Sequence, residues 1–159
     1  FLKTMLTLAE SRDQINVVDD QVGNPTSALD MADGILAVAG NLLAGDAADL
    51  RGLFHMTGAG SVSWADFAME IFAASGRCGG PTATVERIPS SAYPTPARRP
   101  HNSRLDCEKL RQAHDVWLGD WRQAAAQTGG RLIGEGAVPA VQGAVLPAAR
   151  HVEWDERKG

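Results

Sequence analysis

The sequence predicts an α/β fold, because segments with helical spacing of apolar residues alternate with short apolar strands up to residue 127. The loops between these segments hold glycine, proline and hydroxyl residues, which end strands and begin helices. Hydrophobic residues make up 44% of the 159 positions and charged residues 21%, which is enough apolar material for one globular core. We therefore expect one folded unit over residues 1–127 and a loosely ordered tail over residues 128–159.

The amino-terminal residues predict a helix followed by a strand. Residues 1–11 place Leu2, Met5 and Leu6 on one side of a helix, and residues 14–19 are apolar enough for a short strand. The chain begins without methionine and inside the helical pattern, with no capping residue ahead of it. We therefore expect a truncated amino-terminal end.

A loop and a long helix follow the first strand. The loop 20–27 contains Gly, Asn-Pro and hydroxyl residues, and its Thr26 or Ser27 is suited to cap the next helix. Apolar residues from Ala28 to Leu43 recur every three or four positions, which predicts one buried face of an amphipathic helix. The residues of this expected face are Leu29, Ala32, Ile35, Leu36, Ala39 and Leu43.

The middle of the chain predicts a second strand and helix. Residues 52–57 lie between glycines and are typical of a short buried strand that runs into a tight loop. Ser61 or Ser63 can cap the helix expected over residues 64–75, whose aromatic and aliphatic residues follow helical spacing. Gly76, directly after it, is the expected left-handed end of this helix.

The next part of the chain combines a strand, a proline-rich run and two short helices. Residues 83–88 predict the strand. Four of the twelve residues from 89 to 100 are prolines, which exclude a regular helix there and hold the segment extended. Residues 106–114 and 116–127 have the spacing of helices. The second of these helices is expected to place on one face Trp117, Leu118 and Trp121.

Charge, hydropathy and cysteine content exclude several classes of function. A net charge of −4 and a pI near 5.5 disfavour a nucleic-acid partner, which requires a dense Lys/Arg surface. The longest mainly apolar stretch, 34–44, is shorter than the roughly 20 residues that cross a bilayer. Cys78, Cys107 and the four histidines have no metal-ligand or disulfide pattern. Residues 1–10 lack a signal-peptide pattern, so the expected location is the cytoplasm.

Two segments and one tryptophan are candidates for ligand binding. The polar loop 20–26 either lines a pocket or merely connects a strand to a helix. Residues 90–106 carry arginines whose guanidinium groups match phosphate oxygens, although the same arginines could pair with surface carboxylates. Trp64 either stacks on a ligand ring or anchors the start of its helix in the core. The residues that we predict to bind substrate are Arg99, Asn102 and Ser103.

Three segments, taken together, resemble the dTDP-4-dehydrorhamnose reductase family. They are VDDQVGNPT at residues 18–26, GLFH at 52–55 with SW at 63–64, and YPTPARRPHNSRLD at 93–106. The resemblance covers residues 1–126 in order, and its last segment is long enough to be specific.

This resemblance implies a truncated extended short-chain dehydrogenase, of which the chain is the carboxy-terminal, substrate-binding part of a Rossmann-like α/β fold. Residues 1–127 would then form the side that holds the nucleotide sugar. Members of the family are oxidoreductases of dTDP-rhamnose biosynthesis, which supplies polysaccharide biosynthesis. They reduce dTDP-4-dehydro-L-rhamnose with NADPH, and a tyrosine with a lysine four residues later donates the proton. The resemblance also allows a homodimeric parent enzyme.

The sequence departs from the family pattern at the catalytic residues. Tyr93 is the only tyrosine, and Ala97 stands where a lysine would be needed. Gly58 and Gly60 lack the third glycine of a dinucleotide fingerprint. We therefore expect no catalytic or cofactor-binding residues in this chain and no activity of the chain alone. Two alternatives remain: a non-catalytic binding or regulatory subunit derived from a short-chain dehydrogenase, and a related nucleotide-sugar epimerase or dehydratase.

Overall fold

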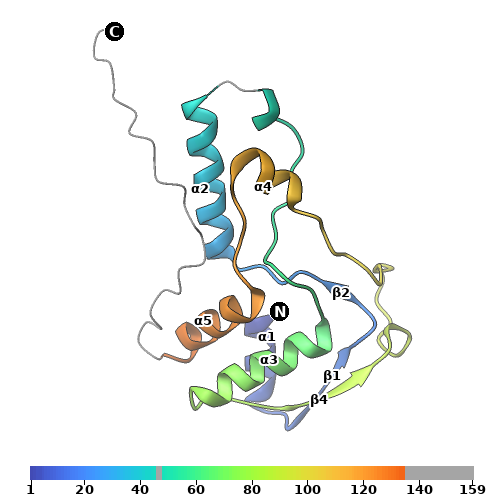
Figure 1. Cartoon of the computed structure of the whole chain (residues 1–159). Helices are drawn as coiled ribbons and strands as arrows, with labels where there is room; N and C mark the ends of the chain where they lie inside the picture. The colour runs from blue at the N-terminus through green and yellow to red at the C-terminus, as the bar shows by residue number, and fades with distance from the viewer. Residues whose placement is uncertain (46–47, 135–159) are drawn as a thin grey trace.

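The structure, a computed structural model, describes residues 1–45 and 48–134 and has an α/β fold (Figure 1). Its longer helices are α1 (Leu2–Ala9), α2 (Ala28–Ala44), α3 (Trp64–Arg77), α4 (Glu108–His114) and α5 (Trp121–Ile133). Its strands are β1 (Gln14–Val18), β2 (Val22–Gly23), β3 (Val62–Ser63) and β4 (Thr84–Ile88). Two single turns of 3-10 helix, η1 (Ala48–Leu50) and η2 (Ser90–Ala92), complete the described elements. None of these helices combines the length and the hydropathy that crossing a bilayer would require.

Two small sheets link distant parts of the sequence. β1 and β4 pair in parallel, in register from Gln14 opposite Thr84 to Val18 opposite Ile88. β2 and β3 pair in antiparallel orientation. The predicted strands at 14–19 and 83–88 are therefore confirmed.

Helix α3 is the centre of the hydrophobic core. It packs against α1, α5, β1 and β4, and Figure 1 shows it between these elements. Its start is fixed by Ser63, whose hydroxyl accepts a hydrogen bond from the backbone N–H of Asp66 at 3.1 Å, which confirms one of the two predicted caps. The buried core cluster consists of Met5, Leu6, Ile15, Val17, Ala65, Phe67, Ala68, Ile71, Phe72, Trp121 and Ala125.

Helix α2 exposes the face that the sequence predicted to be buried. Ile35, Leu36 and Leu43 are 55%, 69% and 89% exposed. The buried residue of this helix is Gly34, where an added methyl group would meet the side chains of Met56 and Leu118. The prediction of this face was wrong because apolar residues lie on several sides of the helix, so their spacing could not select the side that contacts α4. The predicted cap is correct, since Ser27 accepts from two backbone N–H groups at the start of α2.

Three predictions of secondary structure differ from the structure. Residues 52–57 are not a strand, because both sheets of the described residues are built from other segments and a strand requires a paired neighbour. Gly76 lies inside α3, and the left-handed glycine after this helix is Gly79, with φ +70°. Residues 116–120 are not helical, so Trp117 is 38% exposed although Leu118 is buried.

Helix α5 begins and ends later than the sequence predicted. The Asp120 carboxylate accepts from the backbone N–H of Arg122 at 2.8 Å and fixes the start of the helix at Trp121. The helix continues past residue 128 through the buried Gly129 and Gly130, and Gly134 at φ +89° supplies its left-handed end. The rest of the predicted tail, 135–159, lies outside the described residues.

Candidate functional site

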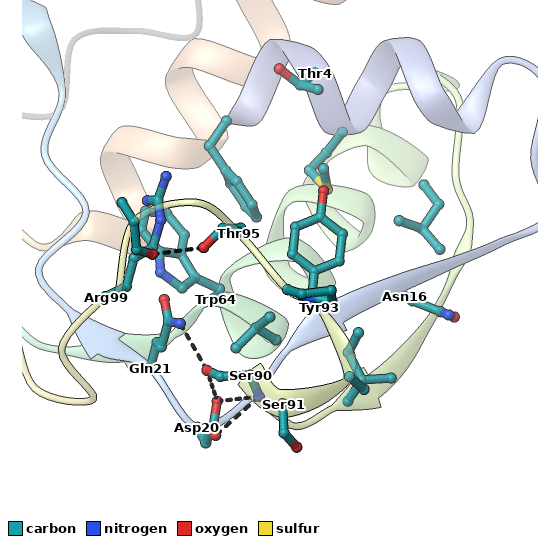
Figure 2. Close-up of a pocket in the computed structure, with 18 of the residues that line it drawn as sticks. Thr4, Asn16, Asp20, Gln21, Trp64, Ser90, Ser91, Tyr93, Thr95 and Arg99 are labelled. Carbon is teal, nitrogen blue, oxygen red and sulfur yellow. Dashed lines mark hydrogen bonds between the residues drawn. The ribbon is translucent and has the colours of Figure 1, made fainter.

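A large cavity lies between α1, β1 and the proline-rich residues 89–100, which we call the strap (Figure 2). Its volume is about 1240 Å³, and sites for small ligands commonly measure several hundred Å³. Aromatic and charged side chains meet in its wall, which is the composition expected of a site for a large polar ligand. The lining residues with aromatic or cationic side chains are Phe1, Trp64, Tyr93, Arg12, Arg98, Arg99 and His101.

The strap is anchored at its first residues by Asp20. The Asp20 carboxylate accepts from the Ser90 backbone N–H at 2.9 and 3.1 Å and from the Ser90 hydroxyl at 2.5 Å. These hydrogen bonds, above all the one from the hydroxyl, hold the pKa of Asp20 below its ordinary value. The Gln21 amide adds a hydrogen bond to the Ser90 hydroxyl oxygen at 2.8 Å. Asp20 is therefore a fixed anion that holds the beginning of the strap.

The other end of the strap is anchored by the same loop. The backbone N–H of Val22 donates to the carbonyl of His101 at 2.8 Å, and the N–H of Ser103 donates to the carbonyl of Val22 at 2.9 Å. The His101 ring nitrogen Nδ1 lies 2.8 Å from the Asp20 carbonyl. The three residues from Asp20 to Val22 thus hold both ends of the strap, so the residues between them are presented over the cavity.

The three predicted site residues lie in two places. Arg99 lines the cavity, and Figure 2 shows it near Trp64. Asn102 and Ser103 lie just beyond the strap, where the Asn102 oxygen accepts from the backbone N–H and the side chain of Arg104 at 3.1 and 3.0 Å. The Ser103 hydroxyl donates to the Val22 carbonyl at 3.1 Å. Ligand contact by all three stays a prediction. The side-chain contacts of Asn102 are local, whereas Ser103 joins the end of the strap to Val22.

The structure adds cavity residues that sequence reasoning did not select. Gln21 and Tyr93 line the same cavity as Arg99. Trp64 packs on the core, with its ring centroid 4.7 Å from that of Phe1, as one of the two alternatives expected. It also lines the cavity, and its stacking on a ligand ring stays a prediction. The position of Gln21 directly after the acidic end of a strand was a signal for this site, because loops after strands commonly carry binding residues.

An ionic cluster supports the start of the loop that holds the strap. Arg87 on β4 donates to Asp19 at 2.7 Å and to Asp66 on α3. The Ser63 hydroxyl lies 2.8 Å from the Asp19 carboxylate and 3.0 Å from that of Asp66. The hydrogen bond from Arg87 is the main cause that lowers the pKa of Asp66. This cluster joins β1, β4 and the first turn of α3 next to Asp20.

Substitution of Arg87 by glutamine is expected to lower the free energy of unfolding near pH 7, because it removes the cation that pairs with both Asp19 and Asp66. Folding lowers the pKa of Asp66, so the pair stabilises the fold above the ordinary value of 3.8, and this contribution is lost as the pH falls through the lower folded value. Urea unfolding of wild type and Arg87→Gln should therefore differ near pH 7 and converge near pH 2.

Arg77→Gln is the matched control for this experiment, because Arg77 pairs with Glu70 at 3.2 Å in a simple surface contact. Its effect near pH 7 is expected to stay below about 0.5 kcal/mol. A loss for Arg87→Gln that is equally large near pH 2 would show that the ionised Asp66 is not the cause.

Three of the described glycines, Gly58, Gly60 and Gly80, are packed closely against other residues. A methyl group at Gly58 would collide with the Pro25 carbonyl, and one at Gly80 would lie 2.6 Å from the Ser75 hydroxyl oxygen. Gly60, at φ +84°, lies against the Trp121 ring. These residues therefore do not fit the pyrophosphate of NADPH, which needs open backbone N–H groups at a helix start. Within 1–45 and 48–134 there is also no group of three or more His, Cys, Asp or Glu residues suited to a metal ion.

Comparison with known proteins gives one consistent result. The family described as "RmlD substrate binding domain" matches residues 1–132. A dTDP-4-dehydrorhamnose reductase of Sinorhizobium fredii is 43% identical over 136 residues, which are 86% of this chain and 46% of that protein. The enzyme of the same name from Escherichia coli K12 is 41% identical over 77% of this chain and 41% of its own length. The chain thus spans less than half the length of these curated relatives.

Solved structures agree with the sequence relatives. The crystal structure of a dTDP-4-dehydrorhamnose reductase from Clostridium acetobutylicum superposes with a TM-score of 0.72 at 34% identity, over 83% of this chain and 43% of that one. The reductase of Bacillus anthracis, solved in complex with NADP, gives a TM-score of 0.67 at 29% identity, over 79% of this chain and 41% of that one.

Proposed function

This chain belongs to the RmlD substrate binding domain family, and from that premise we propose that it forms the nucleotide-sugar side of a dTDP-4-dehydrorhamnose reductase. The reaction of that enzyme is the NADPH-dependent reduction of dTDP-4-dehydro-L-rhamnose to dTDP-L-rhamnose. NADPH would be held by residues other than those described above, because Gly58, Gly60 and Gly80 are packed against Pro25, Trp121 and Ser75. The cytoplasm is the proposed location, and a homodimer is the proposed form of the enzyme.

The observation that carries this proposal is the strap held at both ends over the cavity. Arg98 and Arg99 lie between the two anchors and line the cavity, so two guanidinium groups are available to a diphosphate. The prolines of the strap reduce the conformational entropy that binding would otherwise cost. Trp64 offers an aromatic ring in the same cavity. Diphosphate and ring recognition together suit a nucleotide sugar better than a simple sugar.

The alternatives are less well supported. The reductases compared above favour neither an epimerase or dehydratase nor a regulatory subunit. The proposal is therefore the substrate-binding role in the reductase itself.

Substitution of Arg99 by alanine is expected to weaken the binding of dTDP-L-rhamnose at least tenfold, because a charged hydrogen bond to phosphate contributes about 1.5–3 kcal/mol. Isothermal titration calorimetry of the purified chain measures this effect. Arg111→Ala is the control, since Arg111 lies on α4 and pairs with Glu108 at 3.8 Å. If Arg99→Ala and Arg111→Ala bind dTDP-L-rhamnose with equal affinity, Arg99 has no role in phosphate recognition.

A further inference from the structure

The Gln21 side chain is held in one position at the edge of the cavity. Its backbone carbonyl accepts from the Trp64 N–H at 3.3 Å, and its side-chain nitrogen Nε2 donates to the Ser90 hydroxyl oxygen at 2.8 Å. Figure 2 shows the amide oxygen turned away from Ser90, on the side of Trp64 and Arg99. The backbone of Gln21 is therefore fixed by Trp64 and its amide nitrogen by Ser90, which leaves the other polar atom of the amide for the cavity.

The hydrogen bonds around Ser90 determine which atom that is. Asp20 is ionised, and a carboxylate can only accept, so the Ser90 hydroxyl must give its single proton to Asp20. The Ser90 oxygen can then only accept from Gln21, and this requires the NH₂ group of the amide. The reversed amide would bring two acceptor oxygens together at 2.8 Å with no proton between them. Asp20 thus forces Gln21 to present its oxygen Oε1 to the cavity.

We propose that Gln21 is a specificity-determining residue, whose Oε1 accepts a hydrogen bond from an N–H or O–H group of the nucleotide sugar. This inference rests on the proposed function. At neutral pH a diphosphate has only acceptor oxygens, which Oε1 would repel and Arg99 would attract. Gln21 therefore recognises either the imide N–H of the pyrimidine base or a hydroxyl of the sugar, and Arg99 recognises the diphosphate between them.

The test is calorimetric titration of the chain with three probes: inorganic pyrophosphate, dTDP and dTDP-L-rhamnose. Gln21→Met keeps the length of the side chain and removes the acceptor. This variant is expected to weaken the binding of dTDP-L-rhamnose about five- to tenfold, as the loss of one hydrogen bond predicts. Its affinity for pyrophosphate should not change. Gln112→Met is the control, because Gln112 lies on α4 and donates to Glu108 at 3.0 Å. It should bind all three probes as wild type does.

The arms of the experiment separate the two donors. If Gln21 recognises the base, Gln21→Met weakens the binding of dTDP as much as that of dTDP-L-rhamnose. Wild type should then bind dTDP methylated at N3 as weakly as Gln21→Met binds dTDP. If Gln21 recognises a sugar hydroxyl, the variant weakens the binding of dTDP-L-rhamnose only. Equal weakening of pyrophosphate, or no weakening of any probe, would overturn the inference and leave the proposed function standing. Failure of dTDP-L-rhamnose to bind wild type would overturn the proposed function and this inference with it.

Discussion

The Ile71→Ala variant is expected to lose about 2–5 kcal/mol of unfolding free energy, whereas Ile35→Ala is expected to lose less than about 0.5 kcal/mol. Ile71 is 2% exposed at the centre of α3, so its removal leaves a cavity among the core side chains. Ile35 is 55% exposed on α2, where little buried surface is lost. For a chain of this size, the first change corresponds to a decrease in Tm of roughly 5–15 °C.

The two variants form a matched pair. Each replaces isoleucine by alanine inside a helix, so the gain in helix propensity is the same and the difference reports burial alone. Urea unfolding followed by circular dichroism measures both free energies. Equal losses at the two positions would contradict either the burial of Ile71 or the exposure of α2.

This comparison also marks how far sequence patterns predicted the fold. Spacing identified α2 and α3 equally well as helices, and it identified the face of α3 that is buried. It failed for α2 because the buried side of a helix depends on which neighbour lies there, and the neighbour of α2 is α4, about 70 residues later in the chain. The strand predicted over residues 52–57 was wrong for the same reason, because local apolar character does not show whether a neighbouring strand is present to pair with it.

The candidate site was predicted in part. The rigid, arginine-bearing strap could be recognised locally, because its prolines and arginines are adjacent in the sequence. The hydrogen bonds of Ser90 with Asp20 and Gln21 join residues 70 and 69 positions apart, and no local pattern encodes such a contact. The contacts of Arg87 with Asp19 and Asp66 likewise join residues that are distant in the sequence. The sequence therefore predicted what the strap carries, and the structure was needed to find what holds it.

The chain alone is expected to show no reductase turnover and no saturable binding of NADPH. Hydride transfer requires the nicotinamide to be held within reach of the keto carbon, and this placement supplies much of the rate. The glycines that could have held the pyrophosphate are packed against Pro25, Ser75 and Trp121. The described residues thus offer no dinucleotide turn to orient the cofactor.

Proton donation is expected to fail for a separate reason. Tyr93 is 60% exposed in the cavity, and a tyrosine acts as proton donor in such enzymes when a nearby lysine lowers its pKa. Lys109 donates to the Leu53 carbonyl at 2.9 Å and lies over the Phe54 ring, so it is engaged elsewhere. No lysine lines the cavity within the described ranges. Within the described residues, Tyr93 therefore has no lysine partner of the kind that this proton donation requires.

The measurements are a fluorescence titration with NADPH and a turnover assay with dTDP-4-dehydro-L-rhamnose. The reductase of Escherichia coli K12, which is 41% identical over the matched region, serves as the positive control for both. Binding of dTDP-L-rhamnose without binding of NADPH would match the division of roles proposed for this chain. Saturable NADPH binding or measurable turnover would contradict it, because either result requires a cofactor site that the packing of Gly58, Gly60 and Gly80 does not provide.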